Sequence, residues 1–378
     1  MLKKITVFAA AVLILVSSFG CGTKTGGGKK DPSKKTISPE NKIALIIGSA
    51  SINGDTFEMA KSLRSEYGDN LLVNSFSDSY LSDNLTVTTA AAELAGDDTV
   101  KAIVFGNGVE GTAHAVKRVR QLRGDMCIVV CNPVEDLSSI SLDANIVLLP
   151  NHKETAESMV KNAAKMGAET FVFYTFQRHA DYTFVKEMRE IAKATCGAEE
   201  LNYVETFSID PLVDGSSEEI AKTFVGEDFY RKTKKYGENI AVYSTDPVIQ
   251  EELVKVAAAN GYIVAGTAEL SPVSFANAFG ADIKGHETDS KHILAAASDK
   301  ISKSDSKGKM ASWEFSVPMM TLQAGFEYAY SFVNNRSDWI DNLETIDNIV
   351  GDIADGAPYS VKKHGEKIFL LGSDFYTY

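Results

Sequence analysis

A glycine motif in this chain has the spacing that dinucleotide-binding loops require. Residues 106–111 read GNGVEG, follow an apolar run and precede a helical pattern. In a dinucleotide site, such glycines let a pyrophosphate approach backbone N–H groups at a helix N-terminus. However, the next apolar run ends with Cys131 and Asn132 where a ribose-binding acid is needed, and the motif follows the third apolar run rather than the first. We therefore expect a tight turn whose helix N-terminus faces a ligand cleft, and no cofactor.

Polar and aromatic side chains also gather in the loop after the first apolar run, which reads GSASINGDTF at residues 48–57. In an open α/β sheet, ligands bind at the carboxyl ends of the strands, where such loops meet. Ser49, Asn53 and Asp55 could hydrogen-bond a polar ligand, and Phe57 could stack on it. Asp55 could also cap the helix that begins near Phe57, and the two roles are compatible.

Later apolar runs end in similar side chains. Phe176 and Arg178 are followed closely by Tyr182, and Arg178 could either clamp a ligand carboxylate or phosphate or form a surface salt bridge. Asp246 follows the run NIAVYST and could either contact a ligand or cap the helix that starts beside Pro247. Trp313 could wall a cleft or belong to the core.

The ligand site is therefore expected to draw on strand-end residues from the whole chain. The candidate ligand-binding residues are Ser49, Asn53, Asp55, Phe57, Asn107, Asn132, Phe176, Arg178, Tyr182, Asp246 and Trp313. We expect no catalytic residues, because the sequence has no G-x-S-x-G, H-E-x-x-H or P-loop motif and its six histidines are scattered. The cysteines at 127, 131 and 196 are interpreted as apolar packing residues without a metal. The pattern favours a binding protein over an enzyme.

The N-terminus has the features of a secretory signal peptide. Two lysines precede an apolar run of 12 residues, Ile5–Val16, and small residues follow it. A membrane-spanning helix needs about 20 apolar residues, so this run is too short to be one. The segment Ser18–Cys21 resembles the lipobox of bacterial lipoproteins, although Ser18 stands where leucine is usual. We expect residues 1–20 to be removed and Cys21 to be lipidated; an ordinary signal peptide with an incidental Cys21 is the alternative.

The residues after Cys21 predict a flexible tether to a membrane. Residues 21–40 are rich in glycine, lysine, serine and proline, with almost nothing apolar to bury. The whole chain has a formal net charge of −13, which disfavours nucleic acid as a partner. The chain beyond the tether is longer than one hydrophobic core usually serves, so two domains are expected.

From residue 42 onward, apolar β-rich runs alternate with helical patterns. Such alternation predicts parallel sheets that are covered by helices on both faces. The first series of expected strands lies at residues 43–48, 71–76, 101–106, 127–132 and 145–151. A second series lies at residues 171–176, 201–207, 239–245 and 261–266. The two series predict two doubly wound α/β lobes.

This order of elements resembles the type I periplasmic-binding-protein fold, which solute-binding proteins of ABC importers and effector domains of some repressors share. The resemblance covers about residues 42–335, and its most specific segments are IVLLPNHKETAESMVKNAAKMGAETFVFYTF and NIAVYSTDPVIQEELVKVAAANGYIVAG. It implies two lobes, joined by a hinge that the chain crosses more than once, with the ligand between them. It also places Asp246 where the family often has a ligand-contacting acid. The expected N-terminal lobe is residues 41–150 plus about 275–378, and the expected C-terminal lobe is residues 151–274.

The resemblance implies a solute-binding lipoprotein on the extracytoplasmic face of the cell membrane. Its ligand would be a small polar solute such as a sugar or nucleoside, and its partner an ABC permease. The export signal and the missing DNA-binding domain disfavour the repressor branch. Two alternatives stay open: a ligand-sensing surface lipoprotein coupled to a signalling receptor, and an exported dinucleotide-dependent enzyme.

Overall fold

The computed structural model describes residues 37–38, 40–51, 53–77, 85–334 and 342–378. The expected signal peptide, Cys21 and nearly all of the expected tether lie outside the described residues. Within the ranges that are described, no helix is both long enough and apolar enough to cross a membrane.

The first lobe is built on one seven-stranded sheet with the order β10-β11-β5-β4-β3-β1-β2. All of its neighbouring strands are parallel except β10, which pairs with β11 antiparallel. The strands are β1 (Lys42–Ile47), β2 (Leu71–Ser75), β3 (Val100–Phe105), β4 (Cys127–Cys131), β5 (Ile146–Pro150), β10 (Ser360–His364) and β11 (Ile368–Gly372). The central strands β3, β4 and β5 are apolar on both faces, as a sheet covered on both sides requires.

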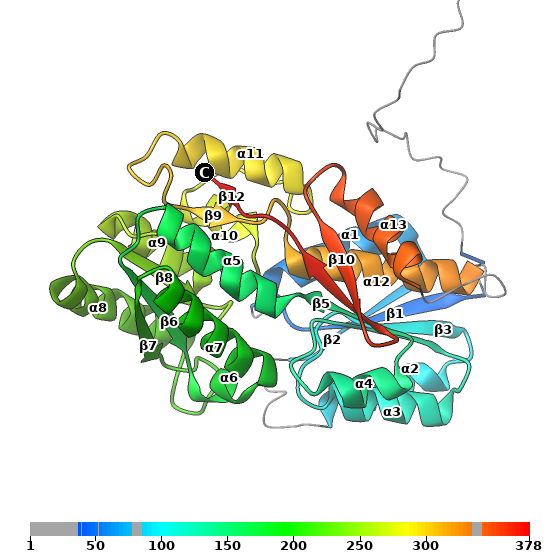
Figure 1. Ribbon diagram of the computed structural model, residues 1–378. Coiled ribbons are helices and arrows are strands. Elements are labelled where there is room, and N and C mark those ends of the chain that lie inside the picture. Colours follow the sequence, from blue (N-terminus) through cyan, green and yellow to red (C-terminus); the bar gives the residue numbers. More distant parts are fainter. Residues whose placement is uncertain (1–36, 39, 52, 78–84, 335–341) are drawn as a thin grey trace, which may run out of the picture.

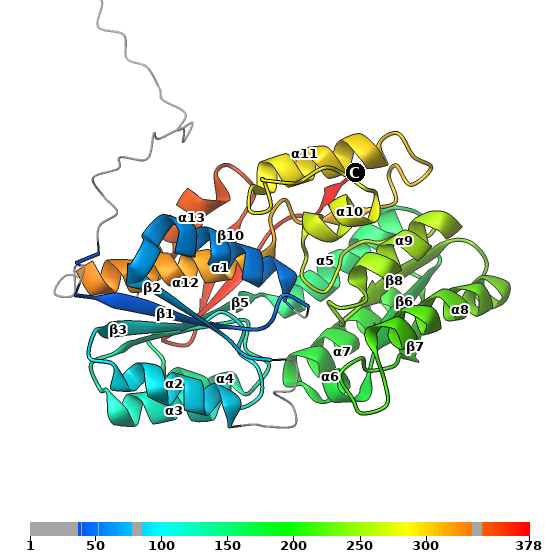
Figure 2. The same cartoon turned by 180° about the vertical axis from the view of Figure 1, so that it is seen from behind.

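Helices cover both faces of this sheet (Figures 1 and 2). Along β1, Leu45 faces one apolar core whereas Ala44 and Ile46 face another, because successive strand residues point to opposite faces. The helices on the Leu45 face are α1 (Gly54–Tyr67), α12 (Val317–Asn334) and α13 (Leu343–Ala354). The helices on the opposite face are α2 (Thr86–Gly96), α3 (Thr112–Leu122) and α4 (Leu137–Asp143).

The second lobe has a smaller parallel sheet with the order β7-β6-β8. Its strands are β6 (Thr170–Thr175), β7 (Asn202–Phe207) and β8 (Ile240–Ser244). The helices α5 (His152–Lys165) and α7 (Thr183–Ala198) cover one face, and the short α6 (Gln177–Asp181) follows β6. The other face is covered by α8 (Glu218–Tyr236), α9 (Gln250–Asn260), α10 (Pro272–Ala278) and α11 (Ser290–Ile301). The strand predicted at residues 261–266 forms only single bridges, at Ile263 and Val264.

The chain passes between the two lobes at three places within the described residues. The first crossing joins β5 to α5, and the second joins β9 (Ala311–Ser312) to α12. The third joins β11 to β12 (Tyr376–Thr377), which pairs with β9. The predicted fold of two doubly wound lobes with a multiply crossed hinge is therefore confirmed.

The second crossing lies later in the chain than the boundary expected near residue 275. Helices α10 and α11 pack in the core of the second lobe, because Phe275, Ile293 and Ala297 contact its apolar side chains. The chain returns to the first lobe only after Ser312. The C-terminal residue Tyr378 then packs back into the second-lobe core.

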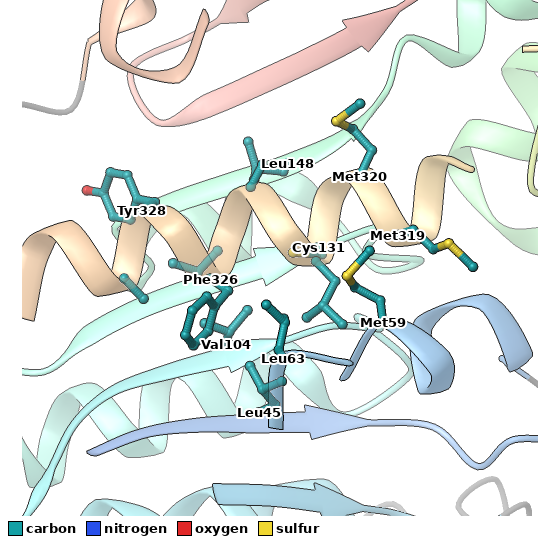
Figure 3. Packing of buried hydrophobic residues seen from close by; sticks show 14 of the residues in the cluster. Leu45, Met59, Leu63, Val104, Cys131, Leu148, Met319, Met320, Phe326 and Tyr328 are labelled. Atoms are coloured by element: carbon teal, nitrogen blue, oxygen red, sulfur yellow. The ribbon is translucent and has the colours of Figure 1, made fainter. Parts of the chain in front are cut away.

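Helix α12 is the centre of the first-lobe core (Figure 3). Met319, Leu322 and Phe326 are buried, together with Met320 and Tyr328 on other sides of the helix. Gly325 lets the helix lie close to the sheet, because a Cβ atom there would be 2.9 Å from Val129 Cγ1 and 3.1 Å from Cys131 Sγ. The helix is therefore buried on nearly all sides rather than amphipathic.

We predict that Gly325→Ala destabilises the protein by about 1–3 kcal/mol, because it forces an atom into a filled contact between helix and sheet. The measurement is the free energy of unfolding from urea denaturation. Gly226→Ala in α8 is the matched control, because nothing lies within 4 Å of its added Cβ. That change should stabilise the helix by about 0.5–1 kcal/mol, since alanine has the higher helix propensity. Equal stability of the Gly325→Ala variant and the wild type would contradict the packing.

Candidate functional site

Side chains that follow strand carboxyl ends in the two lobes contact each other at two places. At the first, Glu110 from the loop after β3 meets Arg178 and Tyr182, which follow β6. At the second, Asp55 in the first turn of α1 accepts a hydrogen bond of 2.7 Å from Ser271 Oγ, which precedes α10. We call the region of these two contacts the interlobe face. It lies at the carboxyl ends of the strands, where ligands bind in open α/β sheets.

Arg178 links carboxylates of both lobes at the first place. Its Nε and Nη2 atoms lie 2.9 Å and 3.3 Å from the two carboxylate oxygens of Asp210. Its Nη1 donates to Tyr182 Oη at 2.8 Å and lies 3.7 Å from Glu110 Oε1. The guanidinium also lies over the Phe176 ring, 5.1 Å from its centroid. Of the two roles weighed for Arg178, the structure shows a salt bridge, which is formed with Asp210 and is partly buried.

Asp246 is buried at the end of β8, beside this network. Its Oδ1 accepts a hydrogen bond of 2.9 Å from the backbone N–H of Val248. It does not cap α9, because that helix begins at Gln250 with Ile249 in the N-cap position. Burial raises the pKa of Asp246 to about 7, opposed by the Val248 hydrogen bond and assisted by the charge of Asp210. A carboxyl group with a pKa perturbed in this way is typical of functional sites.

His179 lies beside these groups and contacts Phe176, Tyr182 and Thr245. Its ring contacts the Phe176 ring at a tilt of 36°, with centroids 4.0 Å apart, and its Nδ1 lies 3.2 Å from Thr245 Oγ1. Burial lowers the pKa of His179 to about 3, and the nearby Arg178 charge acts in the same direction. The imidazole is therefore neutral near pH 7.

Three buried acceptor oxygens near the strand ends have no hydrogen-bond partner among the described residues: Glu110 Oε2, Asn132 Oδ1 and Asp246 Oδ2. Asn132 adopts a left-handed φ of 48° and donates from Nδ2 to Thr321 Oγ1 at 2.7 Å. Its loop is joined to the loop of Glu110, because the Gly108 N–H bonds to Cys131 O at 2.9 Å. A buried acceptor without a partner costs about 1–3 kcal/mol, which a ligand donor could recover.

Most of the predicted residues in the loop after β1, and Asn107 from the loop after β3, make contacts that stabilise the loop after β1. Asn107 Oδ1 accepts from the Gly48 N–H at 3.1 Å, and its Nδ2 donates to Thr56 Oγ1 at 3.2 Å. Asn53 folds over Gly48, since a Cβ on that glycine would lie 2.1 Å from Asn53 Oδ1. Ser49 Oγ lies 2.8 Å from a neighbouring serine hydroxyl, and Phe57 packs against the first-lobe core. The contacts of these residues therefore stabilise the loop and its packing.

A pair of carboxyl groups lies at the second contact between the lobes. Asp55 receives hydrogen bonds from Ser271 and Ser316, and Glu269 receives one from Gln250. Burial raises the pKa of both acids, and the charge of Asp55 raises that of Glu269 further. Asp55 lies inside the first turn of α1, where Asn53 has the N-cap position, so its expected capping role is replaced by a bond to the other lobe.

The glycine motif at residues 106–111 is not shaped for a pyrophosphate. The Glu135 carboxylate accepts hydrogen bonds from the Gly111 N–H at 3.1 Å and the Ala113 N–H at 2.7 Å. The N-terminus of α3 is therefore already occupied by an anion from the protein. A Cβ on Gly108 would lie 2.6 Å from Pro133 Cα, so packing explains this glycine.

Trp313 lies in the second crossing, with 1% of its surface exposed. It packs in the first-lobe core, and its ring contacts Phe315 and Phe375 edge to face. It also lines a small cavity with α5 and β10. Of the two roles considered for Trp313, the structure therefore shows packing in the core.

Several residues of this face were not among the predicted ones, namely Glu110, Asp210, Gln250, Glu269 and Ser271. Asp210 follows β7 as Asp246 follows β8, so the strand-end rule could have identified it. Glu110 lies within the glycine motif itself. Glu269 and Ser271 follow the segment that was predicted as a strand at residues 261–266, so the same rule could have identified them.

Comparison with known proteins gives one family and several structural neighbours. Residues 41–311 match the model of a family described as "Protein of unknown function (DUF3798)". An uncharacterised protein of Treponema pallidum (strain Nichols) is 28% identical over 173 residues, which are 46% of this chain and 80% of that protein. A second uncharacterised protein of that organism is 30% identical over 117 residues, which are 31% of this chain and about half (53%) of that protein.

Two solved structures share the fold at low sequence identity. One, from Clostridium difficile 630 and described as a candidate transcriptional regulator, has a TM-score of 0.72 at 18% identity and covers 90% of this chain and 100% of its own. The other, an ABC sugar transporter subunit from Rhodobacter sphaeroides 2.4.1, has a TM-score of 0.53 at 10% identity and covers 89% and 98%. The family match spans well over half of the chain. The chain therefore belongs to the family described as a protein of unknown function (DUF3798), and it has the type I periplasmic-binding-protein fold.

Proposed function

We propose that this protein binds a small polar solute between its two lobes and works as an extracytoplasmic solute-binding protein for an ABC importer. The observation that supports this most directly is the set of three buried, unpartnered acceptor oxygens on Glu110, Asn132 and Asp246. They come from the strand ends of both lobes, where ligands of this fold class bind. A ligand that donates hydrogen bonds to them would contact both lobes at once.

The chemistry of these atoms favours a ligand rich in hydrogen-bond donors. Two of the three oxygens belong to carboxyl groups, and the nearby cation, Arg178, is already paired with Asp210. Hydroxyl or amino groups would satisfy such acceptors, whereas an anionic ligand would meet more negative charge. A sugar, polyol or nucleoside fits this requirement. Among the structural neighbours, the Rhodobacter sphaeroides protein is named as a sugar transporter subunit, which agrees with this class.

The membrane attachment rests on sequence features of the N-terminus. The segment Ser18–Cys21 and the polar residues after it support lipidation of Cys21 and a tether to the outer face of the membrane. A lipid anchor would keep the two lobes near a permease. Mass spectrometry of the membrane fraction would detect acyl chains on Cys21.

Ligand binding is expected to depend on the unpartnered carboxyl oxygens. In Asp246→Asn, the amide oxygen can still accept from Val248, but an NH₂ group replaces the oxygen that lacks a partner. We predict that at pH 8, where the Asp246 carboxyl is mostly ionised, Asp246→Asn and Glu110→Gln each weaken solute binding about 10–100-fold, the value of one hydrogen bond to a charged group. Isothermal titration calorimetry would follow a thermal-shift screen of sugars, polyols and nucleosides, in which a solute at 100 times its Kd adds about 2.7 kcal/mol.

The control for this experiment is Asp214→Asn, because Asp214 is exposed on the second lobe. It should leave both affinity and melting temperature unchanged. A solute that binds the Asp246 and Glu110 variants as tightly as the wild type would place the site elsewhere. Stabilisation by NAD or NADP alone would instead revive the dinucleotide alternative.

The raised pKa of Asp246 predicts a pH-dependent stability. A carboxyl group whose pKa is about 7 when folded binds its proton more tightly in the folded than in the unfolded state. Its contribution is therefore fully present below about pH 4 and is lost as the pH rises through 7. We predict that the melting temperature of Asp246→Asn, relative to wild type, rises between pH 5 and 8. If the melting temperatures of the variant and the wild type instead change equally with pH over that range, Asp246 does not titrate there.

A further inference from the structure

A second, smaller cavity lies at the hinge, apart from the strand-end site. It has a volume of about 200 Å³ and is lined by residues of all three crossings and of β10. The first crossing contributes the first turn of α5, the second contributes Trp313, and the third contributes residues 372–374. In Figure 1 this is the region where the C-terminal segment runs from β11 past α5 to β12. The cavity walls are Glu154, Thr155, Ser158, Trp313, Pro358, Tyr359, Ser360, Gly372, Ser373 and Asp374.

Two buried polar atoms of this lining have no hydrogen-bond partner within the part of the chain that the structure describes. They are the indole Nε1 of Trp313 and the hydroxyl Oγ1 of Thr155. Trp313 is 1% exposed and Thr155 is 4% exposed. An indole N–H can only donate, and a hydroxyl can donate as well as accept. Both residues line the cavity, so two buried donor groups lie beside it that one acceptor group could satisfy.

The outer part of the cavity is acidic. Glu154 and Asp374 are both exposed, and Glu154 pairs with Lys362 of β10. One carboxylate charge there is therefore balanced by the lysine, and the other remains at the rim. A ligand that is only an anion would be repelled at this rim, whereas an ammonium group would be attracted.

We propose that this hinge cavity binds a small zwitterion of the size and charge of a free amino acid. Its carboxylate would accept from Trp313 Nε1 and Thr155 Oγ1, and its ammonium would lie near Glu154 and Asp374. The volume of about 200 Å³ lies below the roughly 300–1,000 Å³ of pockets for drug-sized ligands, so the occupant is small. Gly372 belongs to the wall, where a Cβ atom would come within 2.6 Å of Ser360 Oγ.

Because the cavity lies at the hinge, a molecule bound in it could change the relative arrangement of the two lobes. Because the walls come from all three crossings, a change of the hinge angle would move them relative to one another. A bound zwitterion shifts the lobe arrangement only as far as it binds one arrangement more tightly than another.

The test is isothermal titration of the full protein with glycine, L-alanine and L-serine as probes. Acetate, ethylamine and glycerol separate the contributions of the carboxylate, the ammonium and neutral hydroxyl groups. The expected result is saturable binding of an amino acid and at least tenfold weaker binding of the three partial probes. Thr155→Val and Trp313→Phe should each weaken the amino acid at least tenfold.

Two controls keep the result interpretable. Thr112→Val removes another buried hydroxyl without a partner at the start of a helix, remote from this cavity, and should leave amino-acid affinity unchanged. Asp246→Asn alters the strand-end site and should also leave it unchanged, so failure of the proposed solute function and of this site are separable. The proposal is overturned if no amino acid binds at millimolar concentration, if Thr155→Val binds as the wild type does, or if Asp246→Asn abolishes binding.

Discussion

One guanidinium group, that of Arg178, fixes the arrangement on which the candidate site depends. It lies between Asp210 of its own lobe, at 2.9 Å, and Glu110 of the other lobe, at 3.7 Å. An ionised carboxylate is costly to bury unless it is paired and hydrogen-bonded, because burial removes its hydration. The shared cation therefore allows acids of both lobes to approach each other. It also fixes the orientation of Tyr182, which bonds to both Arg178 and Glu110.

Apart from the acids that Arg178 contacts, the interlobe face contains three buried carboxyl groups with raised pKa values. Burial raises the pKa of Asp55, Glu269 and Asp246, and the hydrogen bonds that each of them receives offset this only in part. Such an arrangement lowers stability above neutral pH, because each raised pKa marks a charge that the folded state disfavours. Functional sites commonly accept this cost where a ligand later supplies the missing partners. The unpartnered oxygens of the strand ends fit the same explanation.

Beside its small cavity, the hinge contains close contacts between the second lobe and the third crossing. A Cβ on Gly266 would lie 3.0 Å from the Phe375 ring and 3.1 Å from Met159 Sδ, so the second lobe closely contacts the third crossing. Trp313 packs in the first-lobe core and also contacts Phe375. Any rotation of the lobes must therefore be absorbed by a few residues at element ends, as hinge motions usually are. The small hinge cavity lies among those residues.

The sequence by itself predicted the two-lobed α/β fold and most strands of its two parallel sheets. Apolar runs such as CIVVC in β4 predict buried parallel strands, since a strand covered on both faces needs apolar side chains at every position. It also predicted a ligand site at the strand ends, with Arg178, Tyr182 and Asp246 among its residues. Only the tertiary structure decided what these residues contact. Asp210 and Glu110 are 32 and 68 positions from Arg178 in the sequence, and local patterns cannot register contacts at such separations. The same reason explains the misplaced boundary near residue 275, because the apolar faces of α10 and α11 would suit the core of either lobe until the fold selects one.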